Sequence, residues 1–206
     1  KFGPVPLDQA LGAISAHSIR LADRTIKKGA RLTDDDLAAL RKEGHKQAIV
    51  AQLDADDINE DEAAEHLART LCGASIRMDQ PSTGRVNLFA NAPGVLRVEA
   101  ARVQAFNSID ESVTFATLPD YRAVERGEMV ATVKIIPFAV SKSVMDQALS
   151  VIAHAPLVSV HPFIKRKVAA ISTVLPGLKP SVINKTLAVL EGRLAPSGAT
   201  VDTDLR

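Results

Sequence analysis

The stretch VAAISTVLPGLKPSVINKTLAVLEGRL, residues 168–194, decides the fold class of the C-terminal part of the chain. Its first seven residues are an apolar, β-branched run that predicts a buried strand. The Leu-Pro-Gly at 175–177 ends this strand, and Pro180 suits the first turn of a helix. One face of the helix carries Ile183, Leu187, Leu190 and Leu194. Strand, loop and helix in this order predict the first step of an α/β unit.

The loop between this strand and helix is the main candidate for ligand binding. A helix N-terminus offers free N–H groups and the positive end of the helix dipole, which attract anions. Ligands of open α/β sheets also bind at the carboxyl ends of strands. The candidate ligand-binding residues here are Ser172, Thr173, Gly177, Lys179 and Ser181. The alternative interpretation is a structural turn. Because a parallel sheet needs further strands and cover on both faces, we expect residues 157–206 to be an incomplete α/β unit.

The composition is that of an ordinary globular protein. Hydrophobic residues make up 46% of the 206 residues, charged residues make up 24%, and the net charge is +1. This balance gives no reason to expect a nucleic acid or an anionic membrane as a partner. Aromatic residues are only 3% of the chain, which argues against a base-stacking platform. No apolar stretch approaches the roughly 20 residues that span a bilayer, so we expect a cytoplasmic protein.

Residues that could hold a metal ion or act as a nucleophile form no recognisable motif. The single cysteine, Cys72, allows no internal disulfide and is expected to be a small buried hydrophobic residue. The five histidines lack zinc-site spacing, and the acidic run 54–62 lacks the glycine of a calcium loop. Asn59 and Glu62 in that run fit a capping pair at the start of a helix. The sequence therefore predicts no metal site and identifies no catalytic residue.

The first part of the chain, residues 1–74, predicts a small α+β module. A short helix is expected over residues 7–14, and Thr33 is suited to cap a second helix. The run QAIVAQL at 47–53 predicts a strand, and the apolar spacing of residues 59–73 predicts a third helix.

The middle part, residues 75–156, predicts a β-rich module, a small barrel or sandwich. Strands are expected at 85–90, 94–103, 112–118 and 129–138, followed by a helix over 142–154 with Ser141 as its cap. The polar loop QPSTGR at 80–85 ends in Arg85, whose guanidinium suits a phosphate or carboxylate. A plain connection between strands is the alternative interpretation of this loop.

Several segments resemble a known family. They are MDQPSTGRVNL (78–88), FNSIDESVTFATLP (106–119), MVATVKIIPFAV (129–140) and the Ile-Ser-Thr at 171–173 with the later Gly177. In these segments the chain resembles molybdopterin-binding proteins of molybdenum-cofactor biosynthesis. It is similar above all to the N-terminal part of fusions with a nucleotidyltransferase of the molybdenum-cofactor cytidylyltransferase type. Residues 22–53 also resemble the small antifreeze-like (SAF) β-clip modules.

The resemblance implies an α+β fold with three parts. A SAF-like module, 1–74, and a β-rich module, 75–156, precede the start of a truncated molybdopterin-binding α/β domain, 157–206. It implies molybdopterin, or its nucleotide form, as the ligand, and nucleotidyl transfer by a further domain of the parent protein. It also allows a homodimer. Where the family has Thr-Gly-Asp-Glu after its strand, this chain has Thr173 followed by Val174 and Leu175.

Two other functions remain open from the sequence. The chain could be a β-clip interaction module that fixes a dimer or docks a partner without a ligand of its own. It could also be an accessory domain of a sugar-acid enzyme, which would bind small carboxylates.

Overall fold

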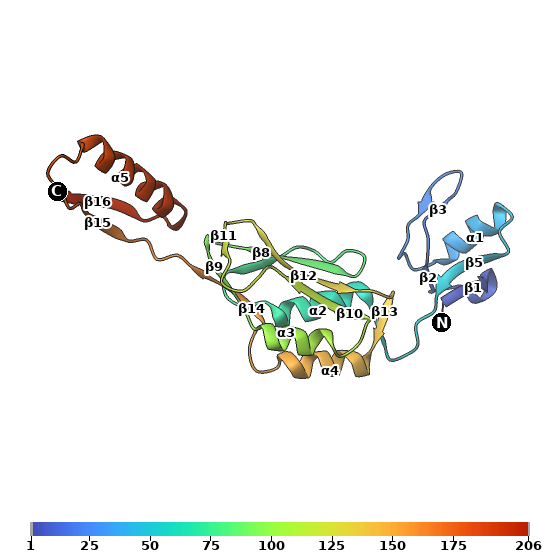
Figure 1. The fold of residues 1–206 in the computed structure, drawn as a ribbon. Helices are drawn as coiled ribbons and strands as arrows, with labels where there is room; N and C mark the ends of the chain where they lie inside the picture. Colours follow the sequence, from blue (N-terminus) through green and yellow to red (C-terminus); the bar gives the residue numbers. More distant parts are fainter. Residues whose placement is uncertain (1, 206) are drawn as a thin grey trace.

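The computed structural model describes residues 2–205, which form three lobes in a row along the chain (Figure 1). We call them the N lobe (2–53), the central lobe (54–163) and the C unit (164–205). Each contains helices and strands, which confirms the expected α+β class. Among the described residues, no helix is long and apolar enough to cross a membrane.

The N lobe is built on an antiparallel sheet of order β1-β5-β2. Its elements are β1 (Phe2–Pro6), a 3-10 turn (Leu7–Gln9), β2 (Ile14–Ser15), β3 (Ile19–Arg20), β4 (Thr25–Ile26), α1 (Asp34–Lys42) and β5 (Gln47–Ala51). Thr33 caps α1 as expected: its side chain accepts from the backbone N–H of Asp36, and the Asp36 side chain accepts from the Thr33 N–H. The buried residues that pack here include Leu32, Leu40 and Val50.

The central lobe contains two larger antiparallel sheets, of order β10-β12-β8-β7 and β11-β9-β14, and the small pair β13-β6. Its strands are β6 (Asp57–Asn59), β7 (Ile76–Met78), β8 (Arg85–Ala90), β9 (Gly94–Val98), β10 (Val113–Thr117), β11 (Ala123–Val124), β12 (Met129–Ile135), β13 (Ala139–Ser141) and β14 (Val158–Pro162). Its helices are α2 (Glu60–Leu71), α3 (Ala100–Asn107) and α4 (Lys142–Ile152). Figure 1 shows the helices gathered on one side of the strands.

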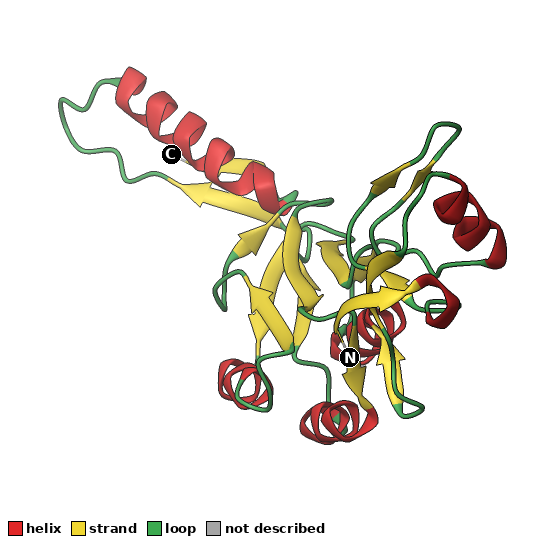
Figure 2. Cartoon of the chain, turned by 90° about the vertical axis from the view of Figure 1, so that its right-hand side faces the viewer, coloured by secondary structure: helices red, strands yellow, loops and turns green. Residues whose placement is uncertain are grey.

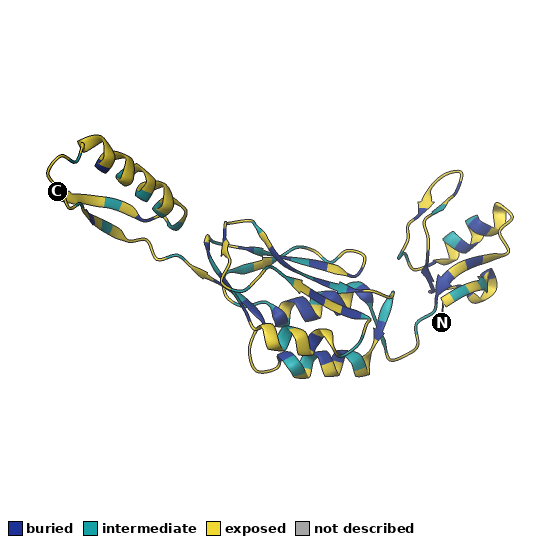
Figure 3. Cartoon of the chain, viewed as in Figure 1, coloured by how far each residue is buried: buried dark blue, intermediate teal, exposed yellow. Residues whose placement is uncertain are grey.

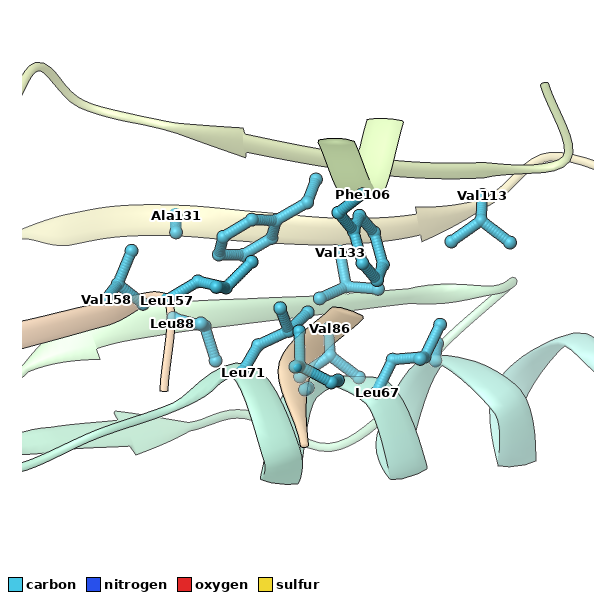
Figure 4. Packing of buried hydrophobic residues seen from close by; sticks show 14 of the residues in the cluster. Leu67, Leu71, Val86, Leu88, Phe106, Val113, Ala131, Val133, Leu157 and Val158 are labelled. Atoms are coloured by element: carbon cyan, nitrogen blue, oxygen red, sulfur yellow. The ribbon is translucent and has the colours of Figure 1, made fainter. Parts of the chain in front are cut away.

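The main core of the molecule lies between these helices and strands (Figures 3 and 4). Helix α2 contributes Leu67 and Leu71, and β8 contributes Val86 and Leu88, all four fully buried. The ring of Phe106 from α3 packs edge-on against the ring of Phe115 from β10, with the two centroids 6.2 Å apart. The opposite face of β8 is less buried, because side chains alternate along the strand: Arg85 is exposed, and Asn87 and Phe89 are half-buried.

Three expectations for these two lobes are wrong. The expected helix 7–14 is only a 3-10 turn, because Gly12 takes a φ of +74° and β2 starts at Ile14. The expected strand 94–103 ends at Val98, and α3 begins at Ala100. The described strands form open sheets with helices on one side rather than a barrel or sandwich, since the helices cover the apolar face.

The lobes also divide the chain at places other than the expected 74 and 156. Helix α2 packs on β8 and β12 of the central lobe, because its apolar stripe from Ala63 to Leu71 joins that core. Strand β14 pairs with β9, so it too belongs to the central lobe. The two buried clusters thus separate the N lobe from the central lobe, and the expected three modules stay a prediction.

The C unit is a parallel strand pair with one helix. Its elements are β15 (Lys167–Ile171), α5 (Pro180–Leu194), a 3-10 turn (Ala195–Ser197) and β16 (Thr200–Leu205). Figure 2 shows α5 lying along the two strands. Ala170, Ile183 and Ala199 are buried, while Ile171 is 78% exposed and Leu205 is 50% exposed. Much apolar surface of this unit is therefore uncovered.

Candidate functional site

The C unit brings the ends of its two strands and the start of its helix to one edge. Strands β15 and β16 run parallel, and Ile171 is the register partner of Leu205. The backbone N–H of Ser172 donates to the Leu205 carbonyl at 2.8 Å, which extends the pairing by one residue. Helix α5 starts at Pro180, after a loop of eight residues that leaves this edge. The arrangement is the one in which α/β proteins bind ligands.

The loop into α5 is held by backbone geometry. Gly177 takes a φ of +85°, in the left-handed region that glycine adopts without strain. The Leu178 N–H donates to the Leu175 carbonyl at 3.0 Å and closes a turn. Lys179 is the N-cap of α5, and no side chain caps this helix start. The first-turn amide of Ser181 and the Lys179 ammonium are thus donors suited to an anion.

Five of the six predicted ligand-binding residues lie in this one segment. Ser172 is half-buried, and Thr173, Gly177, Lys179 and Ser181 are exposed. Their donors could contact a phosphate, but the segment is open to solvent. A ligand here would rest on a surface edge unless another layer covers it.

Arg85, the sixth predicted residue, lies in a different lobe. It opens β8, and its register partner on β12 is Lys134. Lys134 donates to the Thr83 carbonyl in the preceding turn. Like charges directly opposite one another on a sheet are unfavourable. Arg85 and Lys134 are thus adjacent cations of the central lobe, and the structure does not join them to the C unit.

A polar cluster at the start of α2 was missed by sequence reasoning. Glu60 is only 7% exposed, and burial raises the pKa of its carboxyl group, an effect that the charges of Lys134 and Lys28 oppose. Next to it, Asp61 accepts from the backbone N–H of Gly84 at 2.6 Å. Because Lys28 belongs to the N lobe, this cluster joins charges of two lobes.

No sequence signal identifies Glu60. It lies in an acidic run that is typical of an exposed helix start, and its burial depends on Gly84, 24 residues further along the chain. A Cβ at Gly84 would lie 2.7 Å from the Ile135 carbonyl and 2.9 Å from a Glu60 carboxylate oxygen. Glycine is needed there because the turn lies directly against Glu60 and β12.

Metal and thiol chemistry have little support in the described residues. Within residues 2–205, no group of three or more histidine, cysteine or acidic side chains could hold a metal ion. Cys72 is half-buried, and burial raises the pKa of its thiol to about 11. The thiol is therefore protonated at neutral pH and is a poor nucleophile.

Comparison with known proteins gives a partial match. Residues 4–52 are similar to a family described as Domain of unknown function (DUF8806). This range is the N lobe from β1 to the end of β5. No curated protein and no solved structure matches the chain. The similarity therefore covers one lobe and brings no function with it.

Proposed function

We propose that this chain is the N-terminal region of a molybdopterin-binding protein of molybdenum-cofactor biosynthesis, and that the whole protein couples binding to nucleotidyl transfer. The observation that carries the proposal is the edge of the C unit, where the ends of β15 and β16 lie beside the start of α5. The resemblance of the sequence segments gives the ligand class. This chain contributes binding surface, and the transfer step belongs to another domain of the protein.

The donors at this edge fit the phosphate of molybdopterin better than they fit its ring. The hydroxyl groups of Ser172, Thr173 and Ser181, the Lys179 ammonium and the free amide at the start of α5 suit a phosphate. A pterin ring needs flanking surfaces. The proposal requires a further layer of an α/β domain to supply them, and the uncovered apolar side chains Ile171 and Leu205 would suit its packing.

The test is an anaerobic titration of the full-length protein with molybdopterin and with its nucleotide form. We expect saturable binding that Lys179→Ala weakens about tenfold, the cost of one charge-assisted hydrogen bond. Arg193→Ala is the matched control, because Arg193 is a cation in the last turn of the same helix. No saturable binding, or equal losses in the two variants, would reject the proposal.

A second candidate is an interaction module without its own ligand. The N lobe exposes 57% of Leu11 and 43% of Ile49, two apolar side chains that a partner or a second copy could cover. This function predicts stable self-association, which light scattering at high protein concentration would detect. A monomer at all concentrations would leave the ligand-binding proposal as the better one.

A further inference from the structure

A pocket of about 400 Å³ lies where the N lobe meets the central lobe. Phe2 of β1 and Ala51 of β5 line it from the N lobe, and Asp57 of β6 and Phe138, just before β13, line it from the central lobe. Figure 1 shows the start of β1 beside β13. Small-ligand sites measure about 300–1,000 Å³ and are frequent between domains. We call this the junction pocket.

Two phenyl rings form an aromatic wall of the junction pocket. The rings of Phe2 and Phe138 are parallel within 11°, and their centroids are 6.3 Å apart. Phe2 is 66% exposed, in a chain with only six phenylalanines and one tyrosine. Phe2 therefore offers an accessible ring on which a flat cation can stack.

The charges around the junction pocket favour a cation. Asp57 is the charged residue among those that line it. One Asp57 oxygen accepts from the Asp54 N–H at 2.9 Å, which fixes the carboxylate in place. The Lys28 ammonium lies 5.4 Å from the centroid of the Phe138 ring. A cation of the protein itself thus already uses the face of this ring.

We infer that the junction pocket binds a planar organic cation, an amidinium or guanidinium group on an apolar body. Such a group is flat and delocalised, so it stacks on phenyl rings, and its paired N–H donors match a carboxylate such as Asp57. The pocket lies in other lobes than the edge of the C unit. The inference therefore stands or falls independently of the proposed function.

The effect of replacing Lys28 distinguishes a cationic ligand from an anionic one. For a cationic ligand, Lys28 is a competitor that repels it and occupies the Phe138 ring, so Lys28→Gln raises the affinity. For an anionic ligand, Lys28 is the nearest counter-charge on the ring, so the same substitution lowers the affinity. The sign of this one effect separates the two classes of ligand.

The test is a titration of the ¹⁵N-labelled chain with benzamidine, followed by amide chemical shifts. Benzamide is the matched neutral probe, since it keeps the ring and removes the charge. We expect saturable shifts at residues 2, 57 and 138 with benzamidine, and at least tenfold weaker binding of benzamide. Asp57→Asn should weaken benzamidine binding about tenfold, as the loss of a charge-assisted bond does. Asp56→Asn, one residue before β6 and outside the lining of the pocket, should leave benzamidine binding unchanged.

The inference would be overturned by no saturation with benzamidine, by equal binding of benzamide, or by weaker binding after Lys28→Gln. Asp57→Asn retains a side-chain oxygen for the Asp54 N–H, and its amide spectrum shows whether the fold is intact. Phe138→Leu is a second variant, which keeps an apolar side chain and removes the ring. It should abolish saturable benzamidine binding, and unchanged affinity would also contradict the site.

Discussion

At the scale of single residues, Glu60 gives the protein a pH dependence that can be assigned to one carboxyl group. Burial raises its pKa above the usual 4.5 in the folded chain. The folded state therefore holds the proton more tightly than the unfolded state does. Stability contributed by this group is present below pH 4.5 and falls as the pH rises through the folded value.

We predict that Glu60→Gln removes this fall and raises stability at neutral pH relative to the parent protein. Urea unfolding from pH 4 to pH 7 measures the effect for both proteins. Glu62→Gln is the control, because Glu62 is an exposed acid in the same helical turn. Parallel stability curves for the parent and Glu60→Gln would show that Lys28 and Lys134 offset the whole burial cost.

The backbones of β9 and β14 approach each other closely at Gly94. It pairs with Pro162 of β14 and Val124 of β11, and a Cβ here would lie 2.3 Å from the His161 carbonyl oxygen. We predict that Gly94→Ala costs about 1–3 kcal/mol, since backbone must move to admit one methyl group. Gly192→Ala is the contrast: nothing lies within 4 Å of its added Cβ, and it sits inside α5. That change should stabilise α5 by up to about 1 kcal/mol.

Denaturant unfolding of the two glycine variants measures both changes in the free energy of unfolding. Because the glycines lie in different lobes, the Gly94 variant is followed by a probe in the central lobe and the Gly192 variant by helical signal from α5. Equal stability of the Gly94 variant and its parent would mean that β9 and β14 can separate without loss. It would contradict the packing at this position.

At the scale of secondary structure, Asn107 protects an edge strand. Strand β10 lies at the end of its sheet, and its outer edge would expose backbone groups. The Asn107 side chain donates to the Phe115 carbonyl at 2.9 Å and accepts from the Phe115 N–H at 2.8 Å. This pair of bonds imitates a neighbouring strand at one residue.

We predict that Asn107→Ala destabilises the central lobe by about 1–3 kcal/mol, because it leaves both Phe115 backbone groups without these partners. Hydrogen exchange of the Phe115 amide should accelerate together with this loss. Gln104→Ala, an exposed residue of the same helix, should change neither quantity. Slow exchange at Phe115 in the Asn107 variant would show that the edge is protected by other means.

Helices and strands that are marked by an apolar stripe or a capping residue could be predicted from the sequence. Features that depend on contacts between distant segments could not. Helices α2 and α5 have a clear apolar stripe and a polar or proline start, so the sequence placed them to within two residues. The strand predicted over residues 94–103 is wrong in its second half. Its valines, from Val95 to Val103, indicated one continuous strand, but α3 begins at Ala100. The loop before α5 could be predicted because its strand, turn and helix are consecutive in the sequence. The Glu60 cluster and the junction pocket are formed by segments that are far apart in the sequence, so no short stretch of sequence predicts them.

At the scale of the whole molecule, two separate cores explain where the chain divides. One buried cluster contains Leu40 and Val50 of the N lobe, and the other contains residues from Ala63 to Val160. The two lobes meet through Phe2 and Phe138 and through the charges around Glu60. Contacts of this kind are weak compared with a buried core, so each lobe should have a stability of its own.

Leu40→Ala and Leu67→Ala test this separation, because both side chains are fully buried, one in each core. Each should cost about 2–5 kcal/mol in its own lobe. Hydrogen exchange should then accelerate in β1 and β5 for Leu40→Ala, and in α2 and β8 for Leu67→Ala, with the other lobe unchanged. If either substitution lowers protection in both lobes by the same amount, the Phe2 and Phe138 contact together with the Glu60 cluster couples them into one cooperative unit.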